Sequence, residues 1–135
     1  TIHAGEAAGP ESIRQAVDYG TARIGHGVNC IHDKNLMNII AEKGITLELC
    51  PTSNLNTKIV NDIKDYPIDK IINNKIKATI NTDNMTVSGT DEASEMKLIC
   101  DTFGYDGNMR RIFVNNAIDA AFLSDEMKEK LRGNL

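Results

Sequence analysis

The chain alternates short apolar runs with longer segments in which apolar residues recur every three or four positions. The runs have the length of buried strands, and the longer segments have the spacing of amphipathic helices. We predict the end of one strand at residues 1–3 and further strands at residues 22–25, 45–50 and 76–81. Strands that alternate with helices favour an α/β protein with a parallel sheet.

Helix start and stop signals fill the intervals between these strands. Proline at the first helical position, capping Asp or Ser residues and a terminal glycine are the main signals. Between Pro51 and Tyr66 we expect a loop, because proline cannot extend a central strand. The predicted helices run from Pro10 to Gly20, from Asp33 to Gly44, from Pro67, across residues 91–103, through Ile112 and Ala120, and from Ser124.

A polar cluster follows each of the four predicted strands, as at the working end of a β/α barrel. A closed barrel has eight such strands. The chain opens inside a strand, so we predict that residues 1–135 form a single partial domain, the carboxy-terminal half of a TIM (β/α)8 barrel. Half a barrel exposes sheet edges and apolar surface. We therefore expect self-association or pairing with the missing half.

Composition narrows the classes of partner. The chain has 135 residues, 41% of them hydrophobic and 25% charged, which suits a folded domain. Its net charge of −4 favours neither nucleic acid nor an anionic membrane. No run approaches the about 20 apolar residues of a membrane span. The three cysteines form no C-x-x-C pair, so we expect reduced thiols in a cytoplasmic protein.

The polar clusters contain the residue types of a metal hydrolase. His3 can offer a neutral imidazole to zinc and Asp83 a carboxylate. Glu6 follows closely enough to carry a proton beside a metal-activated water, and His26 lies between two glycines that leave room for close approach. Zinc lowers the pKa of bound water to about 7, which suits hydrolysis. The clusters are His3-Ala-Gly-Glu6, Arg23-Ile-Gly-His26-Gly27, Cys50-Pro-Thr-Ser-Asn54 and Asn81-Thr-Asp83-Asn84.

Each residue taken alone also has a structural interpretation. A single histidine such as His32 is most often a surface or capping residue, and Asp83-Asn84 alone is typical of a turn or a helix cap. Arg23 is better explained as a structural ion-pair partner than as a catalyst. Cys50-Pro51 is better explained by the end of a strand than by a nucleophile. Spacing by itself therefore leaves the metal site as one alternative among these.

In this order, the four clusters resemble strands five to eight of the adenosine deaminase family, within the amidohydrolase superfamily, and the resemblance covers nearly the whole chain. The resemblance implies zinc as cofactor, with His3 and Asp83 as ligands. It implies that Glu6 protonates N1 of the purine and that His26 orients and helps to deprotonate the attacking water. Gly5 and Asn84 are then expected to contact the substrate, a small purine nucleoside. The implied reaction is hydrolysis of adenosine or deoxyadenosine to the inosine product and ammonia.

Two departures from the family pattern affect these expectations. Many members have a second aspartate where this chain has Asn84, and an asparagine amide can donate to purine N7 without first taking up a proton. The family's first strand supplies a His-x-His pair to zinc, and this chain contains no such pair. We therefore predict that the chain alone neither binds zinc tightly nor deaminates adenosine.

Two other interpretations stay open from the sequence. The substrate could be a related aminopurine such as adenine, AMP or a methylated adenosine, because these residues act on the ring and not on the sugar or phosphate. Alternatively, the chain could be a non-catalytic oligomerising module that has kept the strand-end residues. Such a module would bind no zinc even beside the missing half of the barrel.

Overall fold

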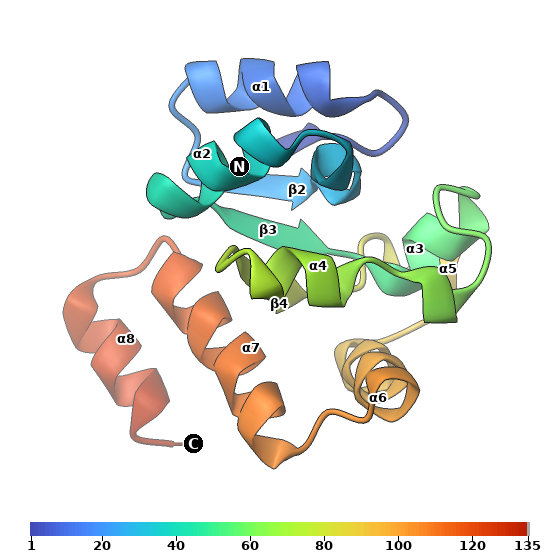
Figure 1. Cartoon of the computed structure of the whole chain (residues 1–135). Helices are drawn as coiled ribbons and strands as arrows, with labels where there is room; N and C mark the ends of the chain where they lie inside the picture. The colour runs from blue at the N-terminus through green and yellow to red at the C-terminus, as the bar shows by residue number, and fades with distance from the viewer. Residues whose placement is uncertain (135) are drawn as a thin grey trace.

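A computed structural model, which describes residues 1–134, shows one parallel four-stranded sheet (Figure 1). The strands follow one another in the order β1-β2-β3-β4, so each pairs with its neighbour in sequence. The predicted parallel α/β arrangement is confirmed. The strands are β1 (Ile2–Ala4), β2 (Arg23–His26), β3 (Thr46–Leu49) and β4 (Lys77–Ile80).

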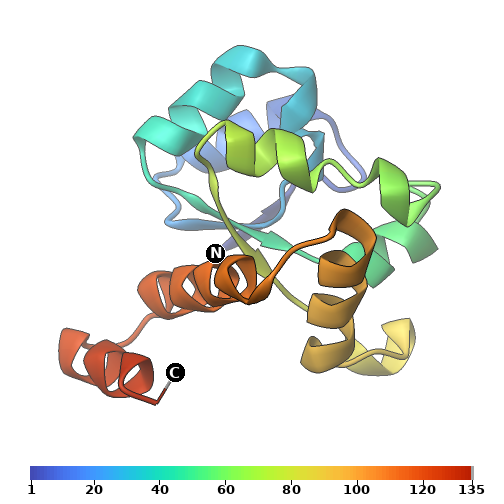
Figure 2. The same cartoon turned by 60° about the horizontal axis from the view of Figure 1, so that its bottom comes forward.

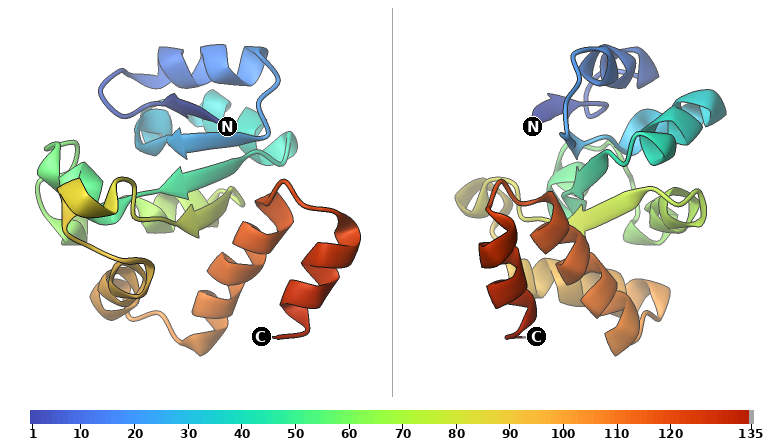
Figure 3. Two further views of the ribbon diagram at one scale, coloured as in Figure 1. Left: turned by 180° about the vertical axis from the view of Figure 1, so that it is seen from behind. Right: turned by 90° about the vertical axis from the view of Figure 1, so that its left-hand side faces the viewer.

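The helices fall into two groups. Helices α1, α2 and α4 lie along the outer face of the sheet, as the side view shows, and α3 and α5 lie beyond the arrowheads of the strands (Figures 1 and 3). The carboxyl ends of the strands and the helices that follow them therefore share one end of the molecule. The helical segments are α1 (Pro10–Asp18), η1 (Val28–His32), α2 (Lys34–Glu42), α3 (Pro51–Asn56), η2 (Ile63–Asp65), α4 (Ile68–Asn73), α5 (Met85–Ser88), α6 (Glu92–Phe103), α7 (Gly107–Ala120) and α8 (Asp125–Arg132).

The predicted loop between Pro51 and Tyr66 is wrong in part. Pro51 ends β3, but it also occupies the first turn of α3, where its missing N–H costs nothing. The side chain of Glu95 reaches across from α6 and accepts a hydrogen bond from the Thr52 N–H at 3.1 Å. A short 3-10 helix, η2, follows before Tyr66. Pro51 therefore marks both the end of β3 and the start of α3.

The core lies between the sheet and the connecting helices. Leu47 at the centre of the sheet and Ile13 on α1 are both 0% exposed. Burying a side chain of this size contributes about 1.5–3 kcal/mol. Ile40, Ile71, Ile99 and Phe113 extend the same core from α2, α4, α6 and α7.

Aspartates cap three helices, and the cap predicted at Asp33 is confirmed. Asp33 accepts from the Leu36 N–H and pairs with Arg14, and these contacts hold the pKa of its carboxyl below the usual value. Asp91 and Asp106 cap α6 and α7, and hydrogen bonds from the helix backbone lower the pKa of each. Caps of this kind fix where each helix begins.

The far end of the chain is largely exposed. Turned as in Figure 2, α7 crosses beneath the sheet and α8 extends beyond it. No residue of α8 is buried, and Met127 and Leu131 on it are 53% and 42% exposed. Among residues 1–134, no helix has the length and apolar character needed to cross a membrane.

Candidate metal and catalytic site

A cavity of about 250 Å³ opens at the carboxyl ends of the four strands. Residues from all four predicted polar clusters meet around it, although Glu6 and Asn84 are not among those that line it. Parallel strands bring their carboxyl ends to one edge, so residues far apart in sequence converge there. The lining residues include His3, His26, Glu48, Cys50, Asp83 and Glu92.

His3 projects into this cavity from β1. In the sheet register it lies opposite Gly25, and a Cβ atom at Gly25 would sit only 2.9 Å from His3 Nδ1. Glycine at this position therefore makes the room that the imidazole needs. The rings of His3 and His26 face each other edge to face, with their centroids 5.1 Å apart.

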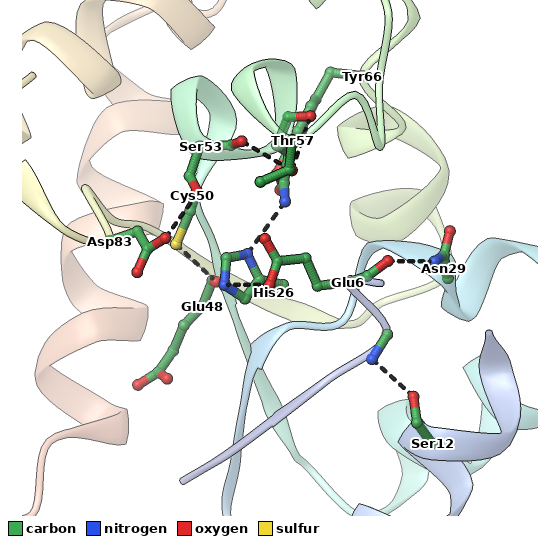
Figure 4. Close-up of polar contacts among 12 residues, drawn as sticks. Glu6, Ser12, His26, Asn29, Glu48, Cys50, Ser53, Thr57, Tyr66 and Asp83 are labelled. Carbon is green, nitrogen blue, oxygen red and sulfur yellow. Dashed lines mark hydrogen bonds and ion pairs between the residues drawn. The ribbon is translucent and has the colours of Figure 1, made fainter. Parts of the chain in front are cut away.

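His26 is held far more firmly than His3. Its side chain is 1% exposed, and its backbone has a φ of 64°, a left-handed conformation that few residues other than glycine adopt. Its Nδ1 is 3.1 Å from Asn54 Nδ2, and Asn54 Oδ1 in turn accepts a 2.9 Å hydrogen bond from the Tyr66 hydroxyl. Its Nε2 lies 3.6 Å from Glu6 Oε2 (Figure 4).

Asp83 follows β4 and also has a left-handed backbone, with a φ of 58°. The Ser53 hydroxyl donates to Asp83 Oδ2 at 2.7 Å, which fixes one carboxylate oxygen (Figure 4). Ligand atoms of His3, His26 and Asp83 all lie within 4.8 Å of one another. The imidazole of His3 and the carboxylate of Asp83 are donors that zinc accepts. The donor set therefore fits the predicted ion.

The two predicted substrate contacts differ in which of their hydrogen-bonding groups lack a partner within the described residues. Asn84 caps α5 by accepting from the Val87 N–H, which turns its Oδ1 toward the helix and leaves its exposed Nδ2 to donate. Gly5 is already engaged on both sides: its N–H donates to Ser12 Oγ and its carbonyl accepts from the Asn29 N–H. Contact of Gly5 and Asn84 with a substrate stays a prediction, and Asn84 has the freer donor.

The structure also shows hydrogen-bond partners of the predicted site residues that we did not assign from the sequence. Ser53 and Asn54 are consecutive on α3, and they hold Asp83 and His26 respectively. Both belong to the Cys-Pro-Thr-Ser-Asn cluster, so the signal was present. Tyr66 carried no signal, because only the fold brings its hydroxyl to Asn54.

Other candidates prove structural. Burial, with the carboxylates of Asp83, Glu95 and Glu48 nearby, raises the pKa of the Cys50 thiol to about 12. A thiol of this pKa is not a nucleophile at neutral pH. Arg23 pairs with Glu48 at 3.0 Å, as expected of a structural ion pair. His32 is exposed at the end of η1.

Comparison with known proteins agrees with this geometry. The sequence model of the family described as "Adenosine deaminase" matches residues 1–135. An adenosine deaminase of Haemophilus ducreyi is 44% identical over 135 residues, which are 100% of this chain and 39% of that protein. The chain thus spans about two fifths of the length of this curated relative.

Solved structures show the same fold. The N6-methyl-AMP deaminase of Arabidopsis thaliana superposes with a TM-score of 0.85 at 30% identity, over 96% of this chain and 38% of that one. An amidohydrolase of Burkholderia ambifaria, solved with bound zinc, superposes with a TM-score of 0.86 at 26% identity, over 97% and 37%. The four strands with their helices are thus part of the barrel of amidohydrolase deaminases.

Proposed function

The chain belongs to the adenosine deaminase family, and from this premise we propose that it supplies the strand-end residues of a zinc-dependent hydrolase that converts adenosine or deoxyadenosine to the inosine product and ammonia. The complete enzyme would include a further part of the barrel, since the chain spans 39% of its Haemophilus ducreyi relative. In this proposal the chain alone has no measurable activity and binds zinc weakly.

His3 and Asp83 would hold the zinc. When bound, the ion supplies the charge that activates water and stabilises negative charge in the transition state. Ser53 keeps one oxygen of Asp83 occupied, so the other would be free to bind the ion. A carboxylate held by a hydrogen bond keeps its aim, which raises metal affinity.

Glu6 would carry the proton to N1 of the purine. Protonation withdraws electrons from the ring and makes C6 more electrophilic, so attack by water becomes easier. His26 lies beside Glu6, with 3.6 Å between His26 Nε2 and Glu6 Oε2, and would orient the attacking water. Asn84 would donate its amide N–H to N7, which needs no added proton.

The single observation that carries the proposal is the convergence of His3, His26 and Asp83, whose ligand atoms lie within 4.8 Å of one another. They come from three different strand ends, and Glu6 adjoins them. A chance cluster on the surface would not be expected to include a histidine that is 1% exposed and hydrogen-bonded through a second residue.

A related aminopurine nucleotide is the second candidate substrate. A solved neighbour at 30% identity is named N6-methyl-AMP deaminase, which supports this alternative. The residues of this chain contact the ring in either case, so they do not separate the two. A cytoplasmic location stays a prediction for both.

The test is an assay of the complete enzyme for ammonia release, with adenosine, deoxyadenosine, adenine, AMP and N6-methyl-AMP compared at equal concentration. We expect the highest kcat/KM for adenosine and loss of activity after zinc is removed by a chelator. Activity that survives chelation, or no release from any of the five compounds, would contradict the proposal. Activity of the purified 135-residue chain would contradict its incomplete status.

A further inference from the structure

A chain of two buried hydrogen bonds lies behind His26 and has a defined direction. The Tyr66 hydroxyl donates to Asn54 Oδ1 at 2.9 Å, and Asn54 Nδ2 lies 3.1 Å from His26 Nδ1. Tyr66, Asn54 and His26 are 2%, 0% and 1% exposed, so bulk water cannot take the place of any of these partners.

The direction follows from which groups can donate. A carbonyl oxygen only accepts and an amide NH2 only donates. The Tyr66 hydroxyl donates to Asn54 Oδ1, so the amide oxygen is turned toward Tyr66 and the amide NH2 toward His26 Nδ1. With the amide reversed, the buried hydrogen of the Tyr66 hydroxyl would lose this acceptor, and a buried donor without a partner is unfavourable.

We propose that Asn54 and Tyr66 are positioning residues that hold neutral His26 in the tautomer with its N–H at Nε2. Because Asn54 Nδ2 donates to His26 Nδ1, that nitrogen carries no proton of its own. The hydrogen is therefore at Nε2, the nitrogen that faces Glu6 at 3.6 Å.

This inference rests on the proposed function and sharpens the role of His26 within it. With its hydrogen at Nε2, neutral His26 approaches the attacking water as a hydrogen-bond donor. It can align the water oxygen toward C6, but it has no lone pair at Nε2 with which to accept the water proton. Ser53, the residue before Asn54 on α3, donates to Asp83. Asp83 therefore faces the cavity as a hydrogen-bond acceptor, whereas His26 faces it as a donor. One short helix would thus set a donor and an acceptor on two sides of the cavity.

The test is 15N NMR of the histidine ring nitrogens in the complete enzyme, with the His26 signals assigned by their loss in His26→Gln. We expect the bonded hydrogen at Nε2 and an unprotonated Nδ1. A hydrogen at Nδ1, or at both nitrogens at neutral pH, would overturn the proposal. This measurement needs no substitution at Asn54 or Tyr66, so it stays decisive even if those variants fail to fold.

Substitutions add a second readout. Asn54→Asp replaces the donor with an acceptor, so we expect the His26 hydrogen to move to Nδ1 and kcat to fall about 10- to 100-fold with KM little changed, as for other groups that orient active-site ligands. Tyr66→Phe should shift the tautomer in part, whereas Tyr105→Phe, which removes another hydrogen-bonded hydroxyl, should leave it unchanged. An unchanged tautomer in Asn54→Asp would contradict the proposal. Absence of adenosine deamination by the unsubstituted enzyme would instead refute the proposed function and leave the NMR result standing.

Discussion

Two hydrogen-bonded networks in the molecule differ in burial. The buried network adjoins the predicted catalytic residues, whereas the exposed one joins charged side chains at the surface. Behind the cavity, Tyr66, Asn54 and His26 form a network with almost no exposed surface. At the opposite end, Asp119 on α7 pairs with Lys77 and with Arg132, whose side chains are 48% and 36% exposed. Water can replace each partner in the second network but not in the first. Losing a hydrogen-bond partner should therefore cost more free energy in the buried network than in the exposed one.

Electrostatics follow the same division. At the exposed network, hydrogen bonds from Arg132 and Lys77 lower the pKa of Asp119, but solvent screens these charges. Around the cavity, burial raises the pKa of the Cys50 thiol and of the Tyr66 hydroxyl. These two groups stay neutral at physiological pH, so Tyr66 is a dependable hydrogen-bond donor.

The largest effect is expected at Glu6. Glu6→Gln keeps the shape of the side chain but cannot transfer a proton to the ring, so kcat of the complete enzyme should fall about 10²- to 10⁴-fold. Steady-state assays with adenosine would measure the loss. Glu42→Gln, an exposed change on α2, serves as the matched control. A Glu6→Gln enzyme with unchanged kcat would remove Glu6 from the mechanism.

A smaller effect is expected at Ser53, which donates to the predicted metal ligand Asp83. Ser53→Ala should weaken zinc binding about 10- to 100-fold, because the carboxylate loses the group that orients it. Competition with a chelator would measure the affinity. Ser94→Ala, at an exposed serine, should bind zinc as the unsubstituted enzyme does. Equal affinity in both variants would show that Ser53 does not support the site.

The buried network should also contribute to stability. Tyr66→Phe leaves Asn54 Oδ1 buried without its donor, so the free energy of unfolding should fall by about 1–3 kcal/mol. Urea unfolding of the complete enzyme would measure it. Tyr19→Phe, at a residue that is 81% exposed, should change stability by less than about 0.5 kcal/mol. The comparison of networks fails if the two tyrosines behave alike.

The smallest effect is expected in the exposed network. Arg132→Ala removes two surface ion pairs, with Asp119 and Glu129, and should cost less than about 1 kcal/mol in the same unfolding experiment. High salt should shrink the difference further, because it screens exposed charges. A loss larger than that of Tyr66→Phe would reverse the proposed ranking of the two networks.

Much of this arrangement could be predicted from the sequence. Apolar runs and helix signals gave the strand–helix alternation, and a parallel sheet necessarily brings strand ends together, so His3, His26 and Asp83 were expected to meet. Local signals were ambiguous where one residue has two effects. Pro51 both ends β3 and starts α3, and only the first was foreseen.

The sequence could not show which neighbours are already occupied. For example, it did not reveal that the backbone N–H and carbonyl of Gly5, a predicted substrate contact, already bond to Ser12 and Asn29. Conversely, the hydroxyl of Tyr66 reaches Asn54 only because the segment between α3 and Tyr66 turns back, with the Ile59 and Val60 N–H groups donating to the Asn54 carbonyl. Such pairings depend on tertiary structure, and no local pattern of residue types encodes them.

The most direct test of the account is the position of zinc in crystals of the complete enzyme, measured by anomalous scattering at the zinc absorption edge. We predict one strong peak at the carboxyl ends of β1 and β4, bonded to His3 and Asp83, with Glu6 and His26 beside it. The account would be contradicted by zinc-loaded crystals that show no peak there, or by a peak bound to other residues.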